Sequence, residues 1–163
     1  MDDADPEGAE SLLSQARELL RGNLVFGWRL ELKAQLISGR LALLRGDLNA
    51  AEATSGELVA RATALGVPRY VSVGRLLAHQ ARHRLGGTPD RNEVAADLDL
   101  LDASVGVEAW RWTGEVAADL GVAAWIDRAA QRADRLASYA GPYAAGLRAA
   151  ARDKVRSWRA ALR

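Results

Sequence analysis

The sequence predicts an all-α fold in which antiparallel helix pairs stack on one another. Apolar residues recur every three or four positions between short turns that contain glycine, as they do along one face of a helix. Alanine and leucine carry most of the 49% apolar content, whereas isoleucine and tyrosine, which favour strands, are scarce. Mid-helix glycines also recur at comparable intervals, at Gly39, Gly74 and Gly114.

We expect eight helices, over residues 6–20, 24–45, 48–65, 68–85, 91–103, 107–120, 123–139 and 143–162. The first carries leucines on one face. In the second, Leu32, Leu36, Gly39 and Leu43 recur at three- and four-residue steps. A Gly-Asp pair at 46–47 separates it from the third. Gly66 ends the third helix, and Pro68 suits the first turn of the fourth.

The second half of the chain is divided by glycine turns in the same way. The most loop-like stretch is 86–90, before a helix that carries Val94, Leu98 and Leu101. Gly121 separates the sixth helix from the seventh, and Gly-Pro at 141–142 separates the seventh from the eighth. Because the connections are short, neighbouring helices should be antiparallel.

The mid-helix glycines indicate a repeat. A period of this length is typical of helix-pair solenoids. Each such glycine costs about 1 kcal/mol relative to alanine, so three at matching places indicate close approach of neighbouring helices. We expect a single repeat domain over 1–163, with residues 1–6 flexible and 143–162 as a C-terminal capping helix.

The pattern resembles the tetratricopeptide repeat family. Leu44-Arg45-Gly46-Asp47-Leu48-Asn49-Ala50-Ala51 matches the turn signature of that family, and Ala64-Leu65-Gly66-Val67-Pro68-Arg69 is similar to repeat junctions in large bacterial ATPase-type regulators. The resemblance covers about residues 24–140, but the 74–86 interval is longer than the family's and 90–104 lacks its consensus. It implies a right-handed α-solenoid that acts as a scaffold or adaptor for protein binding.

By this resemblance, the first helix of each pair lines a concave groove. The predicted partner-binding residues are Lys33, Leu36, Arg40, Leu43, Arg75, His79, Arg82 and Arg111. An acidic peptide or a chain-terminal carboxylate would suit the basic members, because arginine binds carboxylates through paired hydrogen bonds. A merely solvated face is the alternative.

Nothing in the sequence indicates catalysis, a metal or another cofactor. His79 and His83 have a spacing that can hold zinc, but a third ligand would have to come from Asp90 or Glu93 across a glycine turn, and we expect a solvated or groove-lining pair. The acids Glu93, Asp97, Asp99 and Asp102 are interpreted as a solvated helix face, because no calcium-loop spacing follows them. Phosphate-binding glycine loops and serine elbows are absent, so we expect no enzyme.

Two aromatic features allow an interaction role. Trp110 and Trp112 lie two apart, so one is expected in the core and the other at the surface, either packed near Trp125 or as a partner anchor. In the last helix, Leu147, Ala151, Val155, Trp158 and Leu162 form one apolar stripe. We expect this stripe to pack on the preceding pair, with the neighbouring arginines in water; an interfacial membrane helix is the competing interpretation.

Two functions therefore stay open. The first is a protein- or peptide-binding module, within a larger regulator as one option, and the second is a nucleic-acid-associated protein that uses Arg148, Arg152, Arg156, Arg159 and Arg163. The net charge of +1 and acidic stretches elsewhere favour the first over the second. A small molecule bound between helices is a third alternative. Lacking a signal peptide or a long apolar run, the chain is expected to be cytoplasmic, with no membrane partner.

Overall fold

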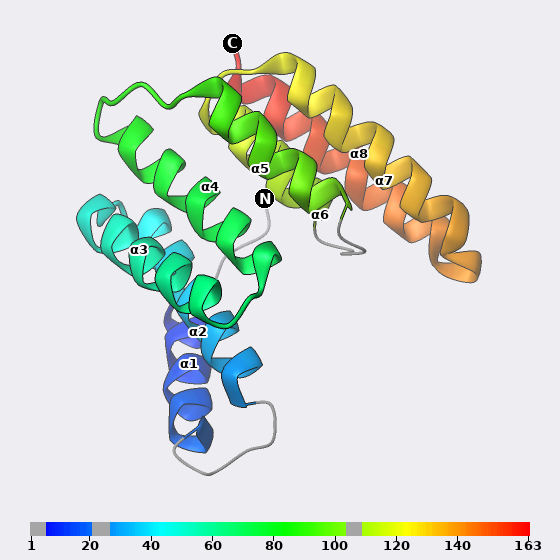
Figure 1. Cartoon of the computed structure of the whole chain (residues 1–163). Coiled ribbons are helices and arrows are strands. Elements are labelled where there is room, and N and C mark those ends of the chain that lie inside the picture. The colour runs from blue at the N-terminus through cyan, green and yellow to red at the C-terminus, as the bar shows by residue number, and fades with distance from the viewer. Residues whose placement is uncertain (1–5, 21–26, 104–108) are drawn as a thin grey trace. The chain divides into compact units, whose positions relative to one another are not determined.

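The computed structural model describes residues 6–20, 27–103 and 109–163, and these are helical throughout apart from short connections (Figure 1). The helices are α1 (Pro6–Leu20), α2 (Gly27–Arg45), α3 (Leu48–Ala64), α4 (Pro68–Arg84), α5 (Arg91–Ala103), α6 (Ala109–Asp119), α7 (Ala123–Tyr139) and α8 (Ala144–Ala161), with a 3-10 turn η1 (Gly141–Tyr143) before α8. No strand occurs in these described ranges. The predicted all-α fold is confirmed.

Helix boundaries agree closely with those expected from the sequence. Every described helix end falls within one residue of its predicted position, apart from the starts of α2 and α6. Two of the expected helix starts, Leu24 and Val107, lie outside the described residues. The N-terminal segment expected to be flexible also lies outside them, apart from Pro6. The chain divides into two compact units, 1–94 and 95–163, and the single domain expected over the whole chain stays a prediction.

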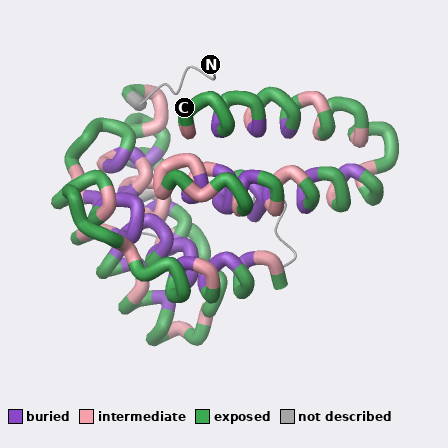
Figure 2. Tube along the Cα trace, turned by 90° about the horizontal axis from the view of Figure 1, so that it is seen from above, coloured by how far each residue is buried: buried purple, intermediate pink, exposed green. Residues whose placement is uncertain are grey.

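In the first unit, each helix packs against the next in sequence, and α2 also contacts α4. Separate apolar clusters hold these contacts together. One joins Leu43 and Ala51 to Leu77 and Ala81, and another surrounds Leu32, Leu58 and Ala62. Buried positions alternate with exposed ones along the helices (Figure 2), as the three- and four-residue apolar spacing predicts.

The turn between α2 and α3 shows why its Gly-Asp pair is there. Gly46 has φ +77°, a left-handed conformation that side chains other than glycine rarely adopt. Asp47 is the N-cap of α3, and its carboxylate accepts a hydrogen bond of 3.1 Å from the backbone N–H of Ala50. The two residues therefore end one helix and begin the next within a single turn.

The second unit is built on the packing of α6, α7 and α8. Its core contains Trp110 from α6, Ile126 and Ala133 from α7, and Val155 and Trp158 from α8. Leu147 and Leu162 are partly buried against the same cluster, and the four arginines of α8 are exposed, as is Arg163 after it. The expectation that α8 packs through its apolar stripe, with its arginines in water, is confirmed.

The three mid-helix glycines all lie where another helix approaches closely. A Cβ atom on Gly39 would come within 2.6 Å of Leu77 Cδ2, and one on Gly74 within 2.8 Å of Val59 Cγ2. A Cβ on Gly114 would overlap the indole ring of Trp158. The expected close packing at these glycines is confirmed.

Two glycines should respond to alanine with opposite sign. A Cβ on Gly56, in the interior of α3, meets nothing within 4 Å, so Gly56→Ala should stabilise the protein by about 0.5–1 kcal/mol. Gly114→Ala should destabilise it by about 1–3 kcal/mol, because the buried, rigid ring of Trp158 has to shift. Urea denaturation measures the change in stability of each variant. If both variants were stabilised, or both destabilised, this packing would be contradicted.

Candidate functional site

The first unit contains a cavity of about 440 Å³ between α3 and α4, which the first turn of α5 borders through Glu93. The residues that line it have the same sequence spacing in α3 and in α4. Glu52, Gly56 and Val59 line it from α3 at positions i, i+4 and i+7, and α4 contributes the triplet Arg75, His79 and Arg82 with the same spacing. One face of each helix therefore forms one wall, with Ser55 and Ala78 beside them.

Polar groups of opposite charge alternate around this cavity. Arg82 Nε donates a 2.7 Å hydrogen bond to Glu52 Oε1 across the two walls. His79 is buried, with 5% of its surface exposed, and its Nε2 lies 3.9 Å from Glu93 Oε2. The buried hydroxyl of Ser55 donates to the carbonyl oxygen of Ala51 at 2.6 Å. With two arginines, two glutamates and one histidine, the cavity offers both charges to a ligand.

The predicted groove residues are distributed over several environments. Arg75, His79 and Arg82 are brought together at the cavity. The α2 residues do not line it: Leu43 is buried in the apolar cluster with Leu77, Leu36 is partly buried, Arg40 is half-buried and Lys33 is exposed. The last predicted residue, Arg111, belongs to the second unit.

Both α6 tryptophans are buried, so the expectation that one of them is exposed was wrong. Trp110 and Trp112 expose only 1% and 3% of their surfaces. The reason is that seven of the eleven residues of α6 are buried, including Thr113, Gly114, Val116 and Ala117, which leaves no wide solvent face. Arg111 is exposed, and its guanidinium carbon lies 5.5 Å from the Trp110 ring centroid, where a cation–π interaction is favourable. Neither indole is therefore available as a partner anchor.

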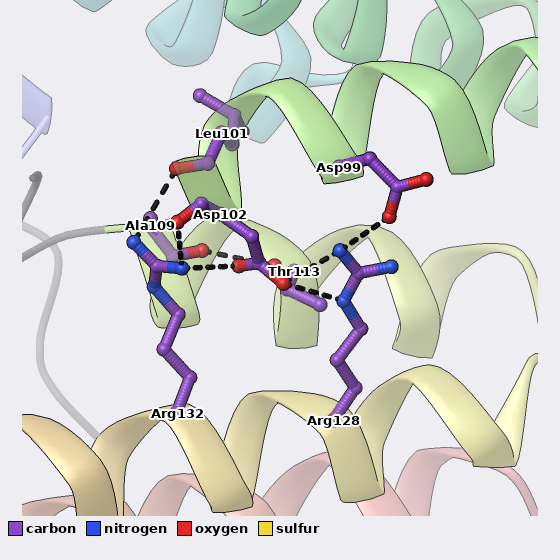
Figure 3. A network of polar contacts seen from close by, with 7 residues as sticks. All are labelled: Asp99, Leu101, Asp102, Ala109, Thr113, Arg128 and Arg132. Carbon is purple, nitrogen blue, oxygen red and sulfur yellow. Dashed lines mark hydrogen bonds and ion pairs between the residues drawn. The ribbon is translucent and has the colours of Figure 1, made fainter. Parts of the chain in front are cut away.

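The acidic residues of α5 form only in part the solvated face expected from the sequence, because Glu93 and Asp99 are exposed but Asp97 and Asp102 are not. Asp97 is buried, and Asp102 is engaged by two arginines of α7 (Figure 3). Arg128 Nε donates to Asp102 at 2.6 Å, and another nitrogen of the same guanidinium donates to Asp99 at 2.7 Å. The expectation failed because α7 supplies counter-charges that are distant in sequence.

Arg132 completes this network at the end of α5. Its Nη1 donates both to the carboxylate of Asp102, at 2.7 Å, and to the backbone carbonyl of Asp102, at 2.6 Å. Its Nη2 donates to the carbonyl oxygen of Leu101 at 3.3 Å. The guanidinium thus caps the last-turn carbonyls of α5, which otherwise have no helical partner (Figure 3).

The same network affects the protonation of Arg128. Burial on its own would lower the pKa of this guanidinium, but hydrogen bonds to Asp102 and Asp99, with the charges of both acids, outweigh burial and raise its pKa. Because the pKa is raised, this stabilisation is present at every pH below the ordinary pKa of arginine and is lost only at still higher pH. Arg128 therefore stays charged at any physiological pH.

The two histidines lie in different environments. His79 lines the cavity, whereas His83 is half-buried, with Nδ1 3.4 Å from the carbonyl oxygen of Gly87. Among the described residues, no group of three histidine or acidic side chains is placed to hold a metal ion. None of the described helices is both long enough and apolar enough to cross a membrane.

The α3 wall of the cavity is the part that sequence reasoning missed. The resemblance to tetratricopeptide repeats directed attention to the first helix of each pair, whereas Glu52, Gly56 and Val59 belong to a second helix. Gly56 was an available signal, because it is a helix-interior glycine outside the repeated glycine positions.

Comparisons with protein-family models, curated proteins and solved structures gave no significant match to this chain.

Proposed function

We propose that the chain is a non-catalytic module that binds a segment of a protein partner in the cavity between α3 and α4. The observation that carries this proposal is Gly56, an exposed glycine in the interior of a helix and in the wall of a cavity. The resemblance to tetratricopeptide repeats, whose members bind proteins and peptides, supports the same function. We further propose a cytoplasmic scaffold or adaptor, as in the bacterial regulators that the repeat junction resembles.

Gly56 differs from the other interior helical glycines of the first unit. Gly39 and Gly74 are explained by close approach of a neighbouring helix, whereas a Cβ on Gly56 would meet open space. A glycine at such a place costs stability without a packing reason, and its effect is to widen the cavity. A partner side chain inserted over Gly56 would account for it.

The charges of the cavity define the chemistry of the partner segment. Arg75 on one wall would pair with a carboxylate of the ligand, and Glu93 at the border would pair with a basic group. The acidic peptide considered from the sequence fits only the arginine side, because Glu52 and Glu93 would repel it. We therefore propose a segment that carries both charges around a small or apolar residue.

Binding is favoured over catalysis by the state of the polar groups. The Ser55 hydroxyl donates to a backbone carbonyl, and the Arg82 guanidinium is hydrogen-bonded to Glu52. A nucleophile needs a base within about 2.6–3.2 Å. The nearest histidine–acid approach in the cavity, between His79 and Glu93, is 3.9 Å.

Selection of short random peptides on the intact chain tests the proposal. Peptides that bind the wild-type protein should bind Gly56→Leu at least about tenfold more weakly, because the leucine fills the cavity and each 1.4 kcal/mol lost is tenfold in affinity. Gly146→Leu is the matched control, since Gly146 is also exposed on a helix and its Cβ would meet open space. The control should bind as the wild type does.

Melting curves show that both variants are folded before affinities are compared. If no peptide is selected, or if the selected peptides bind Gly56→Leu as tightly as Gly146→Leu, the cavity is not a peptide site.

A further inference from the structure

A row of arginines follows one side of α8 in the second unit. Together with Ala130 and Asp134 of α7 it borders a cavity of about 590 Å³. The members of the row, which we call the α8 arginine row, are Arg148, Arg152, Arg156, Arg159 and Arg163. At a helix rise of 1.5 Å per residue the part of the row within α8, from Arg148 to Arg159, is about 16 Å long, with neighbouring arginines roughly one helical turn apart.

Much of this charge is not neutralised within the protein. Arg159 pairs with Asp127 at 2.7 Å, and Arg156 lies 3.9 Å from Asp153 on the same exposed helix surface. In the part of the chain that the structure describes, the side chains of Arg148, Arg152 and Arg163 have no hydrogen-bond or ion-pair partner. Asp134 is the one acid that lines the cavity against five arginines, so the surface is suited to an anionic ligand.

The apolar side of α8 is already used inside the protein. Ala151, Val155 and Trp158 are buried in the core with Trp110 and Ile126. A membrane-surface helix needs a free apolar face to insert between lipids. The α8 arginine row is therefore offered to a ligand in water.

Two exposed tyrosines lie at the turn that leads into α8. Tyr139 at the end of α7 and Tyr143 in η1 expose 89% and 79% of their surfaces, and they flank the turn that leads into α8. The η1 turn packs against both α7 and α8, so the tyrosines are held at this end of the hairpin. Exposed aromatic rings next to a basic groove are the two components of single-strand recognition, in which bases stack on rings and arginines follow the phosphates.

We propose that the α8 arginine row, with Tyr139 and Tyr143, binds single-stranded nucleic acid. The phosphates lie along Arg148, Arg152 and Arg163, and one or two bases stack on the tyrosines. An acidic peptide would use the arginines but would gain little from the rings. The site is separate from the cavity between α3 and α4 and does not depend on the function proposed there.

Fluorescence anisotropy of a labelled oligothymidine with the full chain is the test. Binding should be detectable at about 50 mM salt, with a plot of log affinity against log salt sloping at about −2, as expected for three neutralised phosphates on a single strand. The variant with Arg148→Gln, Arg152→Gln and Arg163→Gln should bring the slope close to zero. Its matched control carries Arg69→Gln, Arg91→Gln and Arg135→Gln, three exposed arginines elsewhere, and should keep the wild-type slope.

The tyrosines are tested separately from the charges. Tyr139→Ala with Tyr143→Ala should weaken oligothymidine binding at least about fivefold and leave the salt slope unchanged, because stacking involves no counterion release. Both side chains are exposed, so the double variant should melt as the wild type does.

Four results would overturn the proposal. They are an absence of binding at low salt, an equal loss in the matched control, an unchanged affinity in the tyrosine variant, and competition by polyglutamate as strong as that by oligothymidine. The last would identify the row as an acidic-peptide surface.

Discussion

Trp158→Ala is expected to lower the free energy of unfolding by about 3–5 kcal/mol. The indole is buried, and it packs edge-on against Trp110 with ring centroids 5.8 Å apart and planes at 64°. Alanine removes this aromatic pair, worth about 0.5–1.5 kcal/mol, and leaves a cavity above Gly114. The loss is large against a typical stability of about 5–15 kcal/mol. Urea denaturation followed by far-UV circular dichroism measures it.

A double-mutant cycle with Gly114→Ala makes this prediction sharper. In the wild type the added methyl group overlaps the Trp158 ring, so Gly114→Ala should destabilise the protein. In the Trp158→Ala background the ring is gone, and the same change should stabilise by about 0.5–1 kcal/mol through helix propensity. The sign of the effect therefore reverses. An equal cost in both backgrounds would show that Trp158 does not cover Gly114.

The positions of the helices were predictable because their signals are local. Asp47 caps α3 through a hydrogen bond to Ala50, three residues away, and Pro68 occupies the first turn of α4. Gly46 and Gly121 mark helix ends, because each has a left-handed backbone conformation that residues other than glycine rarely adopt. Each of these interactions is complete within a few residues, so the sequence alone expresses it.

Contacts between residues of different helices were harder to predict from the sequence. Asp102 looked solvated because its partners, Arg128 and Arg132, are distant in sequence and meet it only once α5 and α7 lie together. One of Trp110 and Trp112 was expected at the surface because two-residue spacing on a helix changes the direction of the side chain. That reasoning fails where a helix is buried nearly all round, as α6 is. The surface residues of α6 are few and charged, and this pattern could have indicated a buried helix.

For the candidate sites too, residues on a single helix were predictable, whereas residues that face each other from two helices were not. The resemblance to tetratricopeptide repeats gave Arg75, His79 and Arg82 as groove residues, and single-helix periodicity gave the α8 arginine row. It could not show that Glu52 and Gly56 of α3 form the facing wall, since that depends on how two helices are rotated against each other.

Asp102→Ala is expected to destabilise the protein by about 2–4 kcal/mol. The substitution leaves Arg132, with 10% of its side chain exposed, without its carboxylate, and it also removes an acceptor of Arg128. Loss of one partner from a buried ion pair costs about 3–5 kcal/mol, and the 18% exposure of Asp102 reduces this somewhat. The midpoint of urea unfolding, at unchanged slope, measures the difference.

Asp127→Ala is the matched control, because it breaks another arginine–aspartate contact of 2.7 Å in the same unit. Asp127 and Arg159 are 57% and 59% exposed, so this change should cost no more than about 1 kcal/mol. The contrast isolates burial as the cause. Replacing both partners, as Asp102→Leu with Arg132→Met, should restore much of the stability lost in Asp102→Ala, because no buried charge is then unpaired. If the double variant were less stable than Asp102→Ala, the capping of the α5 carbonyls by Arg132 would be the larger contribution, and the unpaired charge would not explain the loss.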